Sequence, residues 1–318
     1  MKKTLTLVAM ALALSSNAFA WPDKTITLVV PFPAGGATDA LARTLTPKLQ
    51  EKLKQNVIVD NKAGATGTIG AGFVKRAPAD GYTLLVTSLG PLVIAPYLLA
   101  KVPYEASKDF DYLTVAVQAP NVLVVPASSP YKTMAELIAA EKANPGKLTF
   151  ASAGTGPSDH LSAELFWLQS GTSGLHVPYK GAAPAITDLL GGQVDAAFQN
   201  INNVLPHITA GKLRVLAIAA PKRSPLLPNV PTLTESGVKD ADATSWQGVV
   251  APKGLPPAVK AQIHAALMAA LADPAVKQKF AEVGFEMVAN TPEQFAAYQA
   301  SEAARWKKLI ETRKIAVD

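Results

Sequence analysis

The sequence contains no cysteine among its 318 residues. Disulfide bonds, thiolate catalysis and cysteine-ligated metal sites are therefore excluded. A lipoprotein anchor is excluded as well, because it requires a cysteine at the cleavage point. A chain of this length can bury a large core and does not depend on disulfides for stability.

A strong charge of either sign is also missing. The chain has 30 Lys and Arg against 24 Asp and Glu, and the basic residues are scattered rather than clustered. A nucleic-acid-binding surface would require a basic stripe, so we expect no nucleic-acid partner. The weak positive field that remains can help to collect small anions.

No apolar run is long enough to span a bilayer, which takes about 20 residues. The first 20 residues instead have the three parts of a secretory signal. These are the basic start Met1-Lys2-Lys3, an apolar run from Leu5 to Leu14, and the exit Ala18-Phe19-Ala20. We expect cleavage before Trp21 and a soluble protein in a bacterial periplasm. Without Lys2 and Lys3 the net charge is +4.

The motifs of common enzymes are absent too. The sequence has no Walker A motif, no G-x-S-x-G elbow and no H-E-x-x-H pair. Its four histidines have no metal-ligand spacing. The glycines of 64–70 do not form G-x-G-x-x-G and follow the second strand, so packing of a helix on a sheet explains them better than a dinucleotide. We expect no cofactor, no metal site and no enzymatic activity.

Short β-branched runs alternate with helical segments along most of the chain. This alternation predicts an α/β fold with mostly parallel sheets, and the length allows two domains. Ligands of such sheets bind beyond the carboxyl ends of the strands. The predicted strands are 25–31, 57–60, 83–88, 113–117, 122–125, 148–151, 176–179, 196–199 and 214–219. The predicted helices are 39–53, 67–76, 133–143, 158–169, 182–190, 203–210, 257–271, 274–283 and 292–312.

Prolines and capping residues mark several of these helices. Pro47 predicts a kink or a break in the first helix. Thr133 with Glu136 three residues later predicts a capping box. Three further prolines, at 257, 274 and 292, stand near helix starts, where a missing N–H costs little.

Two glycine turns match each other 120 residues apart. The first turn is 36–42 (GATDALA) and the second is 156–162 (GPSDHLS), each with a further glycine upstream. Thr38 and Ser158 are suited to N-cap the helices that follow. The free N–H groups and positive dipole end of a helix start favour an anion. We therefore expect two lobes that present helix N-termini to a shared cleft, where they would hold a ligand with one or two carboxylates.

Each turn carries an aspartate with two possible roles. Just inside a helix start, Asp39 and Asp159 would stabilise the helix dipole. An aspartate beside a cleft could instead accept a hydrogen bond from a ligand ammonium or hydroxyl. We favour the dipole role for Asp159 and leave both roles open for Asp39.

Several sequence blocks resemble the tripartite tricarboxylate transporter substrate-binding proteins, the Bug family. The opening block is 31–43 (PFPAGGATDALAR), and 61–65, 80–84, 177–181 and 246–252 match later blocks in order. One departure is Ala34, where the family motif has a second proline. The resemblance implies a periplasmic solute-binding protein of two α/β lobes that closes like a Venus flytrap. It places lobe one at 21–121 plus 246–318 and lobe two at 122–245, joined by two crossing strands.

The resemblance also implies a ligand, partners and a site. The ligand would be a small carboxylate or dicarboxylate, and the partners would be membrane transporter subunits. We expect the protein itself to be a monomer. For Phe32, a buried position in the core of lobe one is an equally good alternative to a role in ligand binding. The implied ligand-binding residues are Phe32, Gly35, Gly36, Thr38, Asp39, Ser88, Ser152, Gly154, Thr155, Gly156, Ser158, His160 and Asn200.

Two other functions stay open at this point. The protein could be a periplasmic ligand sensor that docks on a signalling receptor rather than on a permease. It could also be a hydrolase with an unusual site that uses Ser88.

Overall fold

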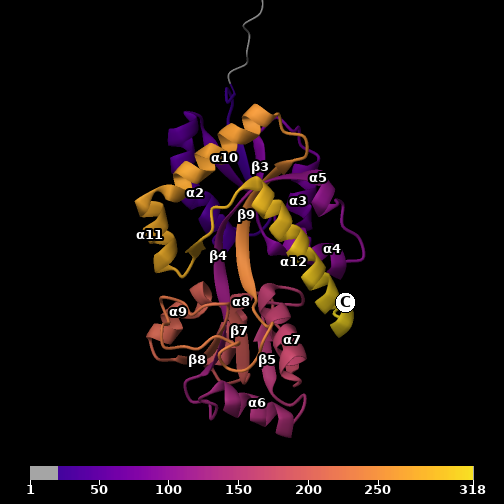
Figure 1. The fold of residues 1–318 in the computed structure, drawn as a ribbon, viewed down its shortest axis with the longest axis vertical. Helices are drawn as coiled ribbons and strands as arrows, with labels where there is room; N and C mark the ends of the chain where they lie inside the picture. Colours follow the sequence, from indigo (N-terminus) through magenta and orange to yellow (C-terminus); the bar gives the residue numbers. More distant parts are fainter. Residues whose placement is uncertain (1–20, 318) are drawn as a thin grey trace, which may run out of the picture.

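The computed structural model describes residues 21–317, so the predicted signal peptide lies outside the described residues. Its strands form one sheet of ten strands in two halves, with helices flanking both halves (Figure 1). We call the half that contains Trp21 lobe one and the other half lobe two. The predicted two-lobed α/β architecture is confirmed. The boundaries 21–121 plus 246–318 and 122–245 stay a prediction.

The sheet of lobe one is built on three parallel strands, of which β1 and β3 are mostly buried and β2 is an edge strand with only Val57 buried. β1 (Ile26–Val30) lies between β2 (Val57–Asn61) and β3 (Thr83–Ser88). β9 (Thr244–Pro252) runs antiparallel to β3, with Ser88 opposite Gln247. Because the three parallel strands share a direction, their carboxyl ends meet at the edge that faces lobe two.

Two long antiparallel strands connect the lobes. β4 (Phe110–Pro126) pairs with β9 as far as Pro120 and Thr244, and then continues into lobe two. The sequence predicted two separate strands within β4 and named no strand at β9. Pro120 does not interrupt β4, because it stands where the partner strand changes and a missing N–H is tolerated.

The sheet of lobe two continues from β4. β7 (Ala196–Asn200) and β8 (Leu213–Ala219) both pair antiparallel with β4. β5 (Thr149–Ser152) lies parallel between β7 and β6 (Leu175–Pro178). The carboxyl ends of β5 and β7 lead into the second glycine turn and Asn200.

The helices agree closely with the predicted segments. Thr133 and Glu136 form the predicted capping box, with Glu136 N donating to Thr133 Oγ1 at 3.3 Å. Pro257, Pro274 and Pro292 each begin a helix, as predicted. The helices of lobe one are α2 (Ala37–Leu53), α3 (Thr68–Lys75), α4 (Ala95–Leu98), α5 (Ala106–Asp109), α10 (Pro257–Ala272), α11 (Pro274–Glu282) and α12 (Pro292–Arg313), with short turns η1 (Ala65–Gly67) and η2 (Gly90–Ile94). Those of lobe two are α6 (Met134–Ala143), α7 (Ser158–Ser170), α8 (Ala182–Leu190) and α9 (Ile201–Thr209).

Pro47 does not break α2, which continues through it to Leu53. A proline inside a helix removes one backbone hydrogen bond. Burial of Leu41, Leu45 and Leu49 holds the segments on both sides against the sheet. A break at Pro47 is therefore wrong, and the alternative of a kink stays a prediction.

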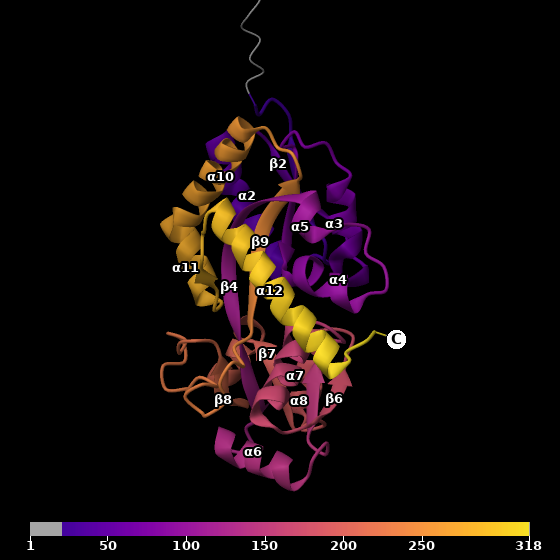
Figure 2. The ribbon, with the colours of Figure 1, turned by 45° about the vertical axis from the view of Figure 1, so that its right-hand side comes forward.

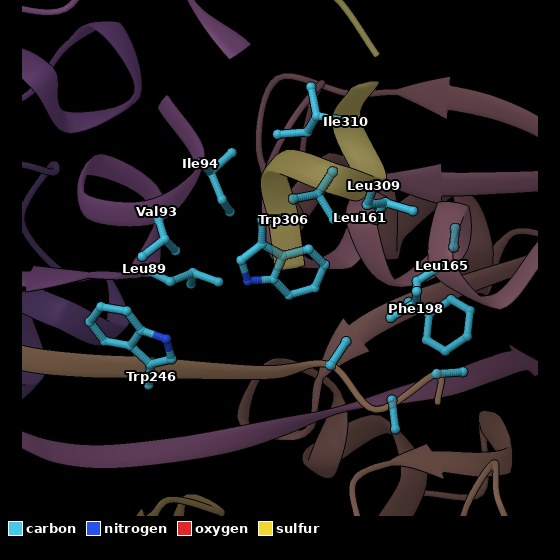
Figure 3. Close-up of a cluster of buried hydrophobic side chains, with 14 of the residues drawn as sticks. Leu89, Val93, Ile94, Leu161, Leu165, Phe198, Trp246, Trp306, Leu309 and Ile310 are labelled. Atoms are coloured by element: carbon cyan, nitrogen blue, oxygen red, sulfur yellow. The ribbon is translucent and has the colours of Figure 1, made fainter. Parts of the chain in front are cut away.

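A buried apolar cluster joins the two lobes through α12. This helix runs from lobe one to the edge of lobe two (Figure 2). Its Leu309 and Ile310 pack with Leu161 and Leu165 of α7, and Trp306 lies between them and the η2 region (Figure 3). The C-terminal half of α12 thus contacts both lobes.

Candidate functional site

The first glycine turn is held together by Asp39, which is 2% exposed. Its Oδ2 accepts hydrogen bonds from the Gly35 N–H and from Arg43 Nε, each at 2.9 Å. Its Oδ1 accepts one from Asn61 Nδ2 at 2.9 Å. Burial would raise the pKa of Asp39, but the hydrogen bonds from Arg43, Gly35 and Asn61 outweigh it and hold the pKa below its ordinary value. Both oxygens of an ionised carboxylate thus have partners within lobe one, and ligand contact by Asp39 stays a prediction.

The predicted N-caps are wrong in both turns. The N-cap of α2 is Gly36, and that of α7 is Pro157. Thr38 and Ser158 therefore lie inside the first turn of each helix. Both helices start earlier because Gly36 and Pro157 are already extended, with ψ of 172° and 164°. Neither cap residue offers a side-chain acceptor, so neither helix start has a hydrogen bond to the side chain of its N-cap residue.

Asp159 repeats the role of Asp39 in the second turn. Its Oδ2 accepts a hydrogen bond from the Ala153 N–H at 2.6 Å, and its Oδ1 accepts one from the His160 N–H at 3.0 Å. Gln199 Nε2 approaches Oδ2 at 3.4 Å. Burial raises the pKa of Asp159 to about 6, against the lowering effect of the backbone donors. Each aspartate therefore reaches back to the loop before its own helix, and Asp159 also bonds the third N–H of α7, while the N-cap residue of neither helix makes a side-chain hydrogen bond.

Two stacked histidines lie behind the second turn. The rings of His160 and His176 have centroids 3.7 Å apart and planes inclined by 17°. The Gly156 N–H donates to His160 Nδ1 at 3.0 Å, and Ser152 Oγ lies 2.5 Å from His176 Nε2. Because the Ser152 hydroxyl donates to the Gly154 carbonyl at 2.7 Å, it accepts from His176 Nε2–H. Burial and the neighbouring His160 lower the pKa of His176 to about 4, so that ring is neutral near pH 7.

Asn121 on β4 links the end of β7 to α7. Its Nδ2 donates to Ser162 Oγ at 2.8 Å and to the Ser158 carbonyl at 3.2 Å. The Asn200 side chain donates to Asn121 Oδ1. Asn200 and Ser158, predicted separately, thus belong to one polar network at the carboxyl ends of the strands.

The sequence missed the left-handed loop that precedes α3. Ala65 and Thr66 have φ of 47° and 54°, in the region that favours glycine, and Gly64 and Gly67 flank them with positive φ. Such backbone strain concentrates at functional sites. A Cβ added to Gly67 would lie 3.2 Å from Phe32 Cζ, so this loop packs against the partly buried Phe32. Close packing was predicted for the glycines of 64–70. At Gly70 of α3, an added Cβ would lie only 2.8 Å from Pro31, the residue after β1, so the helix packs closely there.

The two lobes meet at Gly156 in the second turn. A Cβ added there would lie 2.2 Å from Leu98 Cδ2 of lobe one, and φ is +101°. Only glycine permits this approach. The second turn therefore contacts the α4 region of lobe one directly.

The structure gathers the predicted residues into two groups. The lobe-one group lies on the loop after β1 and at the end of β3, and the half-buried Ser88 has its Oγ 3.8 Å from the place of a Cβ at Gly90. Thr155 is half-buried between its glycine neighbours. The other predicted lobe-two residues form three hydrogen-bonded sets: Ser152 with Gly154, Gly156 with His160, and Ser158 with Asn200 through Asn121.

Within residues 21–317, no helix is long and apolar enough to cross a membrane. Over the same residues, no three His, Asp or Glu side chains gather as metal ligands would.

We expect opposite pH dependences of stability in variants of Asp159 and His176. The folded pKa of Asp159, about 6, lies above its unfolded value of 3.8, so its stabilising contribution is lost as the pH rises toward 6. The folded pKa of His176, about 4, lies below its unfolded value of 6.5, so its contribution is lost as the pH falls toward 4. In the wild type, the contributions of Asp159 and His176 to the free energy of unfolding change in opposite directions with pH and offset each other.

Urea unfolding between pH 4 and 6.5 tests this expectation. In His176→Gln the free energy of unfolding should decrease, relative to wild type, as the pH rises. In Asp159→Asn it should increase. The two variants should diverge by a few kcal/mol over the range, at about 1.4 kcal/mol per pKa unit before solvent screening of the partly exposed histidine. Glu164 titrates in both variants, so its contribution cancels when one variant's curve of unfolding free energy against pH is subtracted from the other's. Parallel curves for the two variants would contradict the expectation.

The sequence is similar to that of a known protein family. The family model described as the tripartite tricarboxylate transporter family receptor matches residues 41–315. Among curated relatives, the protein BugT of Bordetella pertussis is 40% identical over 295 residues, which cover 92% of this chain and 90% of BugT.

Solved structures agree in fold. An R. palustris protein with adipate has a TM-score of 0.84 and 34% identity, over 93% of this chain and 100% of that one. MatC from Rhodopseudomonas palustris with bound malate has a TM-score of 0.80 and 32% identity, over 91% of this chain and 100% of that one.

Proposed function

Because the chain belongs to the tripartite tricarboxylate transporter receptor family, we propose that it is a periplasmic protein that captures a small carboxylate between its lobes and delivers it to membrane transporter subunits. The observation that carries this proposal is the pair of helix starts without side-chain caps, one in each lobe, at α2 and α7. Free N–H groups at a helix start favour an anion. Adipate and malate in the related structures support a dicarboxylate as the class of ligand.

The proposed hinge is the crossing of β4 and β9 near 118–122 and 244–246. The ligand would lie between the first turn and Ser88 on one side and the hydrogen-bonded residues of lobe two on the other. The hydroxyls of Ser88 and Ser158, the Gly36 amide and the second Nδ2 hydrogen of Asn200 would donate hydrogen bonds to a carboxylate without a buried lysine or arginine.

A thermal-shift panel tests the ligand class. We expect malate, succinate, adipate or citrate to stabilise the mature protein by about 2.7 kcal/mol at 100 times the dissociation constant. The matched controls are neutral diamides such as succinamide and adipamide, which should not stabilise it. Stabilisation by the diamides alone, or by none of the acids, would contradict the proposal.

Export and delivery have separate tests. We propose that a signal peptide is removed, so N-terminal sequencing of the exported protein should begin at Trp21. Crosslinking in intact cells should capture transporter subunits. Capture of a signalling receptor instead would favour the sensor function. We also propose that the protein is a monomer, which light scattering on a sizing column measures.

A further inference from the structure

A buried glutamine lies beside the candidate site on β9. Gln247 is 2% exposed and stands directly opposite Ser88, the last residue of β3. Side chains of directly opposed residues in an antiparallel pair lie on the same face of the sheet, about 5 Å apart. Gln247 is therefore the neighbour of Ser88 at the carboxyl end of β3.

The face on which Gln247 lies is the one that α2 covers. Val86 and Val249, two residues from Ser88 and Gln247, pack in the same buried cluster as Leu41 of α2. Side chains two residues apart on a strand share a face. The neighbouring Trp246 faces the other way, against Phe295 of α12. Gln247 and the uncapped start of α2 are thus on the same side of the lobe-one sheet.

The amide of Gln247 is only half satisfied. Its Nε2 donates a long hydrogen bond of 3.4 Å to Ser245 Oγ. Its buried Oε1 has no hydrogen-bond partner among residues 21–317. Ser245 lies beyond the end of β3 and pairs with Ala119 of β4, so the amide leans toward the hinge. A buried acceptor without a donor is unfavourable, and a hydrogen-bond donor on the ligand would remove that cost.

We infer that Gln247 Oε1 accepts a hydrogen bond from a hydroxyl or amine on the ligand. This inference rests on the proposed function and narrows its ligand class to hydroxy- or amino-substituted carboxylates. A carbonyl oxygen repels a carboxylate, so the acid groups lie at the helix starts and the substituent lies over Gln247. Ser88 on the neighbouring strand flanks the same substituent.

Calorimetry with succinate, malate and aspartate tests the inference, because these acids share one carbon chain and differ in its substituent. Wild type should bind malate or aspartate at least tenfold more tightly than succinate. Gln247→Met, which keeps the size and removes the amide, should lose that preference and bind succinate within about twofold of wild type. The exposed Gln193→Met is the matched control and should leave all three affinities unchanged.

The remaining outcomes are distinguishable. Tighter or equal binding of succinate by wild type overturns the inference and leaves the proposed function standing. Equal losses for succinate and malate in Gln247→Met also overturn it, because the amide would then bind the shared carboxylates. Binding of no carboxylate overturns the proposed function itself. Unfolding of Gln247→Met without ligand should show at most a small loss of stability, because only the long hydrogen bond from Nε2 to Ser245 is removed. A large loss would reveal a protein partner for Oε1 and overturn the inference.

Discussion

The Gly156→Ala variant should fold and bind its carboxylate about 10- to 100-fold more weakly than wild type. The added methyl group would lie 2.2 Å from Leu98 Cδ2 of lobe one. Overpacking of this kind costs about 1–3 kcal/mol, and 1.4 kcal/mol corresponds to a tenfold change in affinity. Because the clash exists only where the lobes meet, it penalises the closed arrangement that would enclose the ligand. Calorimetry with the tightest ligand of the panel measures the loss.

Backbone strain must be separated from the clash. Gly254 has the same φ of +101°, but a Cβ there would meet only Ala79, at 3.9 Å. Gly254→Ala therefore carries the strain without the contact and should bind normally. The double variant Gly156→Ala/Leu98→Ala should recover to within about threefold of Leu98→Ala alone. Equal losses in the two glycine variants would refute the interlobe contact as the cause.

Trp306→Ala should lower the free energy of unfolding by about 3–5 kcal/mol, the range for a buried large aromatic residue. Trp306 is fully buried in the cluster that joins the lobes, where Leu89 and Val93 approach it from lobe one (Figure 3). Its Nε1 donates to Glu302 Oε2 at 2.9 Å, so the variant also leaves a mostly buried carboxylate without this donor. Urea unfolding monitored by circular dichroism measures the change.

Phe73→Ala is the control for Trp306→Ala. Phe73 is 41% exposed on α3, and its loss should cost less than about 1 kcal/mol. A small effect of Trp306→Ala, or an equal one for both variants, would mean that the cluster contributes little to stability.

The sequence predicted most of the fold because its signals are local. Helix periodicity, the Thr133 capping box and the three starting prolines each depend on residues within one turn of each other. The long strands were harder to predict from the sequence. β9 combines Trp, Gln and Gly in a run that shows no clear alternation, and its place in the sheet depends on pairing with distant β3 and β4.

The site was predicted in part. The matched turns correctly indicated two helix starts, but the cap residues were wrong because the extended backbone ends at Gly36 and Pro157, so each helix starts earlier than predicted. His176 and Gln247 gave no usable signal, since His176 meets His160 only through the pairing of β5 with β6, and Gln247 meets Ser88 only through β3 and β9. The resemblance to a family supplied the list of site residues, and their ligand contacts stay a prediction.

Besides β4 and β9, the C-terminal half of α12 supports lobe two on lobe one. Arg313 Nε donates to Glu164 Oε2 at 2.5 Å beside the apolar contact of Leu309 with α7, and Glu164 Oε1 lies 3.6 Å from His160 Nε2. A hinge motion about β4 and β9 alone would separate α12 from α7 at this contact. Opening about the proposed hinge in β4 and β9 therefore has to separate the Arg313–Glu164 ion pair and the buried contact of Leu309, so this contact favours the arrangement in which the lobes meet.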